Sequence, residues 1–274
     1  MPATTFIVPR RFAAAVRVRE LHLAILDLIR GWTRIGGERE AVAWGEVLRN
    51  ERYPLVHMAN LAWADATPPG GPREILGALE RAYLGTDVRH RHVLFADAMR
   101  AYEAQDAFGS LGFQPTAELA LAKVGLPVCI ANPDVDVREV GDGADEAEFR
   151  TVTLAVHTDL GYTPEESMQV YELDRVRVEA IGERRYLAFL RGEPAGTFTL
   201  WPRGRFALIG NVGTVPRHRM RGVARTMIFQ ACSRAVDLHF EYVLLTAALL
   251  GTPRVMYETL GFRPVGEIRG FLRR

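Results

Sequence analysis

The hydrophobic and polar positions divide this chain into alternating helix-like and strand-like segments. Apolar side chains recur with a helical period over residues 11–30, which predicts a helix. Residues 144–159 also predict a helix, with acidic residues at its start as the helix dipole favours. Shorter runs, alternating or wholly apolar, predict strands at residues 134–140, 185–191, 195–201, 206–215 and 242–248. The segments together predict the α/β (α+β) class, with a mixed, mostly antiparallel sheet and helices on both of its faces.

Local signals mark several ends of these elements. Thr163, Pro164 and Glu166 have the spacing of an N-cap, a first helical position and a capping box, so a helix is expected to start there. The Gly192-Glu-Pro194 sequence predicts the turn of a hairpin. Pro127, Asn132 and Pro133 interrupt the chain, which predicts a linker over residues 125–133.

Two segments of the first 130 residues are harder to interpret. Residues 53–63 have the pattern of a strand that crosses the sheet. The run Arg89-His90-Arg91-His92 suggests a basic or metal-binding cluster, but a solvated hairpin is favoured because alternate side chains of an extended segment point to opposite faces.

The segment over residues 212–225 carries the strongest chemical signal. A strand-like run ends at Pro216, three arginines follow (Arg217, Arg219 and Arg221), and after Gly222 an amphipathic helix is predicted over residues 223–238. A helix that starts directly after a strand presents free backbone N–H groups and the positive end of its dipole, which together bind anions. Gly222 allows a ligand to approach the backbone closely. We therefore expect an anion-binding cradle at this junction.

Two motifs in this region resemble those of a known enzyme family. The pattern Arg219-x-x-Gly222-x-Ala224 after Val215-Pro216 resembles the pyrophosphate-binding signature of the GNAT superfamily of acyl-CoA-dependent N-acyltransferases. About forty residues later, Tyr257-Glu-Thr-Leu-Gly-Phe-Arg resembles the closing segment of the same family. Thr252, Pro253 and Arg254 depart from the family pattern just upstream, so contacts to the pantetheine arm are expected to differ.

The resemblance implies a site as well as a fold. It implies that acetyl-CoA, or another acyl-CoA, is the co-substrate, with no metal, and that Tyr257 protonates the leaving thiolate. A main-chain N–H near Val215 would polarise the thioester carbonyl. Asp159, Glu166, His157 and a water relay remain open as the base that deprotonates the amine. The residues expected to contact the cofactor are Gly213, Thr214, Val215, Arg217, Arg219, Met220, Arg221, Gly222, Val223 and Ala224.

A short repeat suggests that the chain is a tandem. Leu111-Gly-Phe-Gln-Pro115 and Leu260-Gly-Phe-Arg-Pro264 each close a helix-like segment and open a strand-like one. Aligning them places Phe108 opposite Tyr257, and places residues 67–73, which contain a single arginine, opposite residues 215–221. We therefore expect a degenerate GNAT-like domain at residues 1–130, structural or acceptor-binding in role, and a catalytic GNAT domain at residues 131–274.

Composition excludes several classes of protein. A formal net charge of +1 argues against a nucleic-acid binder. All 34 lysine and arginine residues except Lys123 are arginine, which is the bias that a GC-rich genome gives. The two cysteines form no metal-binding or redox pattern. The sequence also shows no membrane-spanning run and no secretion signal, so we expect a cytoplasmic protein without a membrane partner. A monomer or a homodimer is compatible with these features.

The function expected from the resemblance is an acyltransferase (EC 2.3.1.-) that moves an acetyl group directly from acetyl-CoA to a primary amine of a small molecule. Two alternatives stay open. One is an N-acetyltransferase that acts on proteins or peptides, and the other is an inactive CoA-binding sensor, which a retained Tyr257 argues against.

Overall fold

A computed structural model describes residues 10–141 and 143–274. The first half contains α1 (Arg10–Thr33), β1 (Glu38–Val42), β2 (Gly45–Arg49), β3 (Leu61–Ala64), α2 (Gly71–Ala82), β4 (Arg91–Phe95), α3 (Ala98–Gly109) and β5 (Gln114–Lys123). The second half contains β6 (Val135–Glu139), α4 (Ala144–Asp159), α5 (Pro164–Ile181), β7 (Arg184–Leu190), β8 (Glu193–Arg203), β9 (Phe206–Thr214), a 3₁₀ turn (Pro216–His218), α6 (Val223–Asp237), β10 (Tyr242–Ala248), α7 (Thr252–Thr259) and β11 (Arg263–Arg273).

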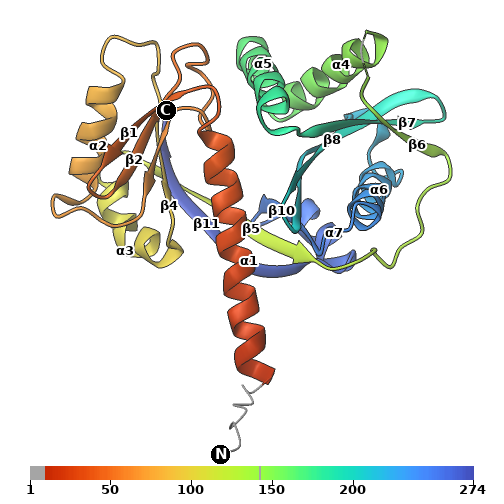
Figure 1. Cartoon of the computed structure of the whole chain (residues 1–274). Helices are drawn as coiled ribbons and strands as arrows, with labels where there is room; N and C mark the ends of the chain where they lie inside the picture. Colours follow the sequence, from red (N-terminus) through yellow and green to blue (C-terminus); the bar gives the residue numbers. More distant parts are fainter. Residues whose placement is uncertain (1–9, 142) are drawn as a thin grey trace, which may run out of the picture.

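All the described strands form one sheet that runs through both halves. Its order is β1-β2-β3-β4-β11-β5-β10-β9-β8-β7-β6, and among these strands only β3–β4 and β9–β10 pair in parallel. The last strand of each half has crossed over: β5 pairs with β10 of the second half, and β11 pairs with β4 of the first. The predicted fold class is confirmed, and the exchanged strands join the two halves into a single sheet (Figure 1).

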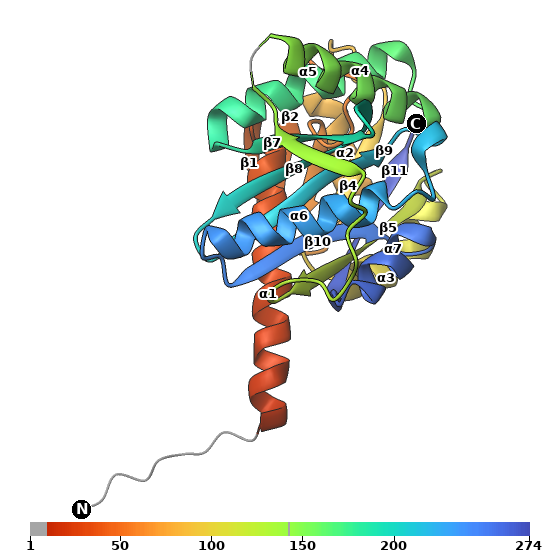
Figure 2. The same cartoon turned by 90° about the vertical axis from the view of Figure 1, so that its right-hand side faces the viewer.

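Helices cover both faces of this sheet. On one face, α2 and α3 cover the first half, and α6 and α7 cover the second. On the other face lie α1, α4 and α5; α1 crosses β11 and β5 in the middle of the molecule, and its N-terminal part extends beyond the sheet (Figures 1 and 2). The alternation of side chains along β10 shows the division, since Val243 and Leu245 pack under α6 and α7 while Leu244 packs under α1.

The two halves repeat one arrangement of elements. Strands β1-β2-β3-β4 and β7-β8-β9-β10 have the same order and the same directions, with a helix between the third and fourth strand of each set. The Leu-Gly-Phe segments make matching turns, in which the N–H of Phe113 donates to the carbonyl of Phe108 and that of Phe262 to the carbonyl of Tyr257. Phe108 and Tyr257 therefore occupy equivalent positions, as the aligned repeats predicted.

Most of the predicted elements are present, with two exceptions in the first half. Residues 51–60 form turns, and the strand starts only at Leu61, because Asn60 satisfies the backbone of the turns through its side chain. The solvated hairpin at residues 89–92 is also wrong: β4 is central, and His90 and His92 are buried and donate to the carbonyls of Asn60 and His57. Across the described residues, no helix has both the length and the apolar character that a membrane span requires.

Candidate functional site

The site begins where two neighbouring strands separate. The parallel pairing of β9 with β10 ends at Ile209 and Leu245. Beyond these residues β9 continues along β8 as far as Thr214, while β10 follows β5 as far as Ala248. A bulge against β8 at this point places Asn211 in the left-handed region, at φ 50°, and turns β9 away from β10. The sheet therefore opens in its own plane toward the carboxyl ends of the two strands.

The loop that follows β9 leaves backbone donors free. The N–H groups of His218 and Arg219 close the 3₁₀ turn, and the first intrahelical bond of α6 is that from Thr226 to Gly222. Among the described residues, the N–H groups from Met220 to Arg225 have no acceptor. Since α6 also directs the positive end of its dipole here, this turn fits a phosphate or diphosphate.

Two residues give the turn its shape. Met220 and Gly222 both have left-handed backbone angles, with φ 58° and 79°. The linker supports the turn from behind: the Asn132 side chain donates to the carbonyl of Arg221 at 2.8 Å, and its backbone N–H donates to the Thr226 hydroxyl at 2.9 Å. The predicted linker at residues 125–133 thus also buttresses the loop.

The three arginines of the loop have different partners. The Arg219 guanidinium pairs with the Asp159 carboxylate at the end of α4 and donates to the Thr214 carbonyl. Arg217 donates to the buried His218 ring, and among the described residues neither Arg217 nor Arg221 has a carboxylate partner. Arg217 and Arg221 are therefore the charged side chains available to an anion, whereas Arg219 fixes the loop to α4.

The last residues of β9 are packed tightly against α4. A Cβ at Gly213 would lie 2.7 Å from Val156 Cγ1, so glycine is needed here for helix packing as well as for any ligand. The N–H of Val215 donates to the Ala195 carbonyl at 2.9 Å, so it is not free to polarise a thioester, contrary to expectation. Neighbouring backbone groups of a strand point to opposite edges, so the N–H of Thr214 points toward the opening instead. The buried Thr214 hydroxyl also has no hydrogen-bond partner among the described residues.

The remaining predicted cofactor residues differ in exposure. Val223 is buried in the core under α6, and Ala224 packs partly against it. Met220 is almost fully exposed. Val223 can therefore contribute only its backbone to a ligand, whereas the Met220 side chain is accessible. A pocket of about 250 Å³ adjoins the start of the loop, with walls from α4, from Pro194 on β8 and from Val215 and Arg217.

Tyr257 lies on α7, which packs against β10. Its ring is buried in the core cluster that contains Val243, Leu245 and Ala247 of β10, and burial raises the pKa of its hydroxyl to about 12. It therefore holds its proton across neutral pH. In the part of the chain that the structure describes, this hydroxyl makes no hydrogen bond to another residue.

Two of the three side chains considered as bases are held by other residues. The Asp159 carboxylate is paired with Arg219, and the Glu166 side chain accepts from the Thr163 N–H in the predicted capping box. His157 is half-buried on α4, and its pKa is lowered by burial.

Sequence reasoning missed two carboxylates that the structure brings to the strand opening. Asp174 of α5 accepts a hydrogen bond from the Asn211 side chain at 3.0 Å, and Glu183, between α5 and β7, is 6% exposed. Burial, and then the neighbouring Asp174, raise the pKa of Glu183 to about 7. Glu183 follows a helix-ending glycine, and nothing in the local sequence distinguishes it from a surface residue.

The equivalent strands of the first half do not separate. The pairing of β3 with β4 extends to Ala64 and Phe95 at the end of β3, and the N–H of Ala96 still donates to the Ala64 carbonyl. The N–H of Asp65 donates to the Trp44 carbonyl, which matches the bond from Val215 to the Ala195 carbonyl. Gly70 precedes α2 at the N-cap position that Gly222 has before α6. The aligned segment is thus residues 65–70, and the alignment of residues 67–73 with 215–221 is wrong by several positions because the first-half loop is shorter.

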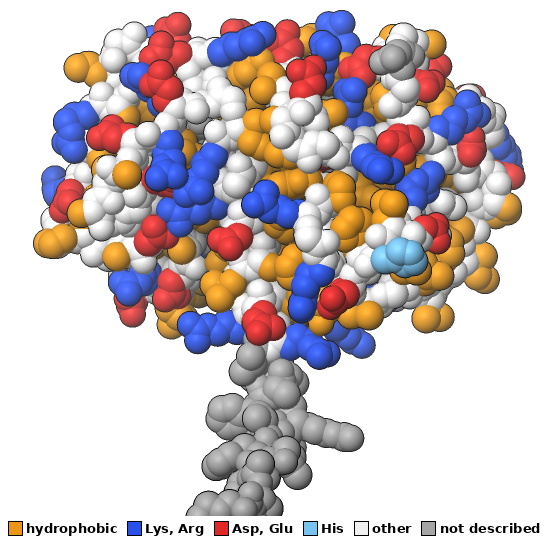
Figure 3. All heavy atoms as spheres, viewed as in Figure 1, with side chains coloured by type: hydrophobic (Ala, Val, Ile, Leu, Met, Phe, Trp, Pro, Cys, Tyr) orange, Lys and Arg blue, Asp and Glu red, His pale blue; other side chains and the backbone are white. Residues whose placement is uncertain are grey.

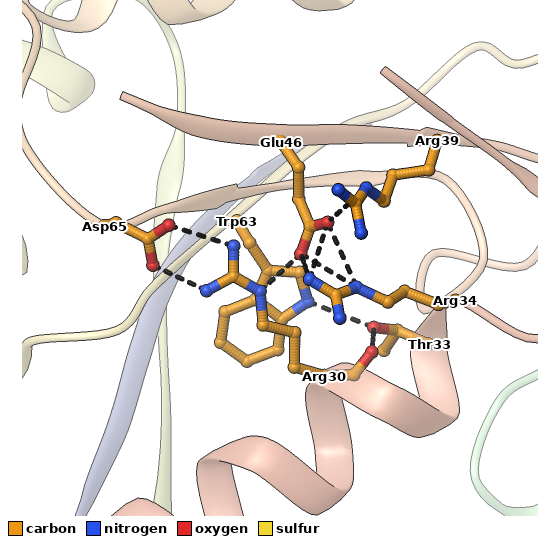
Figure 4. A network of polar contacts seen from close by, with 7 residues as sticks. All are labelled: Arg30, Thr33, Arg34, Arg39, Glu46, Trp63 and Asp65. Atoms are coloured by element: carbon orange, nitrogen blue, oxygen red, sulfur yellow. Dashed lines mark hydrogen bonds and ion pairs between the residues drawn. The ribbon is translucent and has the colours of Figure 1, made fainter. Parts of the chain in front are cut away.

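Ion pairs close the first half at this position (Figure 4). Asp65 pairs with Arg30 of α1 at 2.6 and 3.0 Å. The Glu46 carboxylate, 2% exposed on β2, accepts from Arg30 and Arg34 and is paired with Arg39. Because buried charges are stable only when paired, this network holds α1 against β2 and β3. The first-half loop therefore has an acidic residue where the second-half loop has Val215, and no free arginine.

The face of the molecule seen in Figure 3 shows no segregation of charge. Acidic and basic side chains are interspersed over the face seen in Figure 3, in keeping with the net charge of +1. The loop of residues 216–222, in contrast, brings backbone N–H groups without acceptors and two arginines without carboxylate partners in the described chain to one turn.

Comparisons with known proteins agree with this geometry. Residues 152–262 match the model of the acetyltransferase (GNAT) family. No protein with a curated description matches the chain.

Several solved structures share the fold. A functionally unknown conserved protein from Staphylococcus epidermidis has a TM-score of 0.70 at 14% identity, covering 87% of this chain and 94% of its own. A GCN5-related N-acetyltransferase from Kribbella flavida has a TM-score of 0.61 at 17% identity, covering 93% and 94%. A tandem GNAT protein from the clavulanic acid biosynthesis pathway has a TM-score of 0.51 at 16% identity, covering 84% and 78%. At these identities the likeness concerns the fold.

Proposed function

Residues 152–262 form a domain of the GNAT acetyltransferase family, and from this premise we propose that the protein transfers an acetyl group from acetyl-CoA to a primary amine of a small molecule. Acyl transfer is the reaction class that the family supports. The acetyl group, the amine and the residues named below belong to the proposal.

One observation supports the proposal most strongly: the sheet opens between β9 and β10 directly beside a turn whose backbone N–H groups are free. The diphosphate of the cofactor would bind the free N–H groups from Met220 to Ala224, with Arg217 and Arg221 adding charge. The pantetheine arm would lie between β9 and β10, where the strands have separated beyond Ile209 and Leu245. Strand edges that separate leave backbone groups unpaired, and an amide-containing chain satisfies them.

The thioester would lie near the base of the opening. The Thr214 N–H, which points into the opening, is the donor best placed to stabilise the negative charge that develops on the carbonyl oxygen. Tyr257 lies in the core on the face covered by α7, and in this proposal its hydroxyl faces the thioester. It would donate its proton to the thiolate as the carbon–sulfur bond breaks.

The first half favours a small acceptor over a protein. Its turns at residues 51–60 pack against α5, with Tyr53, Val56 and Ala59 contacting Leu173. The N–H of Leu55 donates to the Gln169 side chain at 2.9 Å. In this proposal the contact walls the α5 side of the acceptor site, whereas a protein acceptor needs an open groove. We assign residues 1–130 to a degenerate copy that closes the acceptor site and residues 131–274 to the catalytic copy, with a monomer or a homodimer as the working form.

The proposal is tested by turnover of acetyl-CoA with a panel of amines, using the wild type and Tyr257→Phe. Phenylalanine keeps the ring packing and removes only the acid. We expect Tyr257→Phe to lower kcat by about 100-fold at neutral pH, since a positioned acid contributes 10²–10⁴-fold, while the affinity for acetyl-CoA stays unchanged.

Three results would contradict this. If the wild type acetylates no amine but binds acetyl-CoA, the protein is a CoA-binding sensor. If Tyr257→Phe weakens cofactor binding as much as turnover, the tyrosine packs against the ligand and is not the acid. Acetylation of peptide N-termini in preference to small amines would replace the acceptor class.

A further inference from the structure

A carboxyl group is buried directly beside the point where β9 leaves β10. A Cβ built on Gly210 would lie 3.9 Å from Glu183 Oε1 and 2.9 Å from the Thr199 hydroxyl. Gly210 is the first residue of β9 beyond the parallel pairing that ends at Ile209. Because position 210 has no side chain, the Glu183 carboxyl and the Thr199 hydroxyl both lie against the strand at the base of the opening.

This carboxyl is buried beside the Thr199 hydroxyl with one of its two oxygens unsatisfied. Glu183 is 6% exposed, and its Oε2 atom makes no hydrogen bond with any of the described residues. An unsatisfied buried carboxyl oxygen lowers the stability of the fold, so its presence calls for a functional reason. Three nearby charged groups face it: Asp174 and Arg177 from α5, and Arg185 from β7, which is itself paired with Glu146.

Glu183 and Tyr257 approach the opening from opposite faces of the sheet. Side chains alternate along β8 and β9, and Phe198 and Ile209 point into the core under α6 and α7, where Tyr257 lies. Thr199 and Gly210 therefore face the other side, toward α5, and Glu183 lies beside them. An acid for the sulfur and a base for the nitrogen must reach different atoms of the reacting group, and this arrangement separates them.

We infer that Glu183 is the general base of the acetyl transfer and that Asp174 and Asn211 are positioning residues that connect it to solvent; the inference rests on the proposed function. The acceptor enters as an ammonium ion and gives one proton to the Glu183 carboxylate. Its nitrogen then forms the new bond to the acetyl carbon while the carbon–sulfur bond breaks. The second nitrogen proton passes through the Tyr257 phenol to the thiolate, and the proton on Glu183 leaves past Asp174.

The electrostatics of the group suit this role. With a pKa near 7, raised first by burial and then by the charge of Asp174, the carboxyl takes up and releases protons at the pH of the cell. Asp174 lies between it and the exposed Asn211 side chain, and Arg177 donates to Asp174 at 3.2 Å. Asp159 and Glu166, in contrast, are held by an arginine and by a helix cap.

The test is the pH dependence of kcat/KM for the amine, measured for the wild type, Glu183→Gln and the control Glu179→Gln, which alters an exposed glutamate of α5. Glutamine has the shape of the protonated side chain, so folding is preserved. We expect Glu183→Gln to lower kcat/KM by about 100-fold or more, with acetyl-CoA affinity unchanged. It should also remove the acidic limb of the profile, which is the fall in kcat/KM as the pH drops below about 7 and the base is protonated. Glu179→Gln should match the wild type.

A second variant keeps the inference testable if Glu183→Gln is unstable. Asp174→Asn removes a like charge near Glu183, so it should move the acidic limb to lower pH without abolishing activity. An unchanged profile in Glu183→Gln, or an unmoved limb in Asp174→Asn, would overturn the assignment while leaving the proposed function intact. A wild type that transfers no acetyl group to any amine would overturn both.

Discussion

At the scale of single residues, the structure shows that side chains of ordinary sequence context acquire unusual chemistry through burial. His90 and His92 lie in a run of alternating arginine and histidine, yet both are buried and neutral. Burial lowers the pKa of His90 to about 3 and that of His92 to about 4. Their rings lie near His57, whose centroid is 4.3 Å from that of His90. Each donates one N–H to a backbone carbonyl, which fixes the turns at residues 51–60 beside α5.

These two histidines predict a loss of stability in mild acid. Their folded-state pKa values lie below the value near 6.5 of the unfolded chain, so the unfolded state binds more protons below pH 6.5 and stability falls as the pH is lowered. At pH 5 each histidine should contribute about 2 kcal/mol of destabilisation relative to neutral pH, at 1.36 kcal/mol per pH unit. Urea unfolding at pH 7 and pH 5 measures this difference.

The comparison of variants isolates the histidines from other titrating groups. His90→Gln/His92→Gln keeps a side-chain donor at each position and should lose less stability between pH 7 and pH 5 than the wild type. His239→Asn alters an exposed histidine with a left-handed backbone and should behave as the wild type does. An equal acid dependence in the double variant and the wild type would show that these side chains are not buried as described.

At the scale of elements, the exchange of β5 and β11 is what makes the two halves one structure. β5 lies between β11 and β10, and β11 lies between β4 and β5, so each half provides the strand that completes the edge of the other. A half without its partner would expose an unpaired edge of β10 or β4 together with the apolar residues under α1.

We therefore expect residues 1–130 and residues 131–274 not to fold when each is produced alone, and to form a stable complex when produced together. Circular dichroism and size-exclusion chromatography of the separate and combined fragments measure this. Cooperative unfolding of residues 131–274 alone, with retained affinity for acetyl-CoA, would contradict the role given to β5.

The sequence predicted elements better than their arrangement. The helix start at Thr163, the hairpin around Gly192 and the loop between β9 and α6 follow from local signals, and all three are present. The exchange of β5 and β11 could not be predicted, because the Leu-Gly-Phe segments before the two strands are nearly identical and give no preference for either edge. Glu183 was missed for a similar reason, since its role depends on Gly210 and Asp174, which are distant in sequence.

At the scale of the whole molecule, the two halves show the same architecture in an open and a closed form. In the second half the strands separate, and the turn before α6 presents free N–H groups and two arginines without carboxylate partners in the described chain. In the first half the strands stay paired to the end of β3, and ion pairs of Asp65 and Glu46 hold α1 over them. This contrast supports our proposal that the second copy receives the cofactor and that the first supports it and covers the acceptor side.

The central claim is that the turn before α6 binds the diphosphate of acetyl-CoA, and calorimetric titration of acetyl-CoA tests it most directly. Gly222→Val places a side chain on a backbone with φ 79° and blocks close approach, whereas Gly70→Ala alters the equivalent cap of the first half. We predict that the wild type and Gly70→Ala bind acetyl-CoA equally and that Gly222→Val, folded by its melting temperature, binds at least about tenfold more weakly, or about 1.4 kcal/mol. A wild type that does not bind, or a Gly222→Val that binds as the wild type does, would contradict the account.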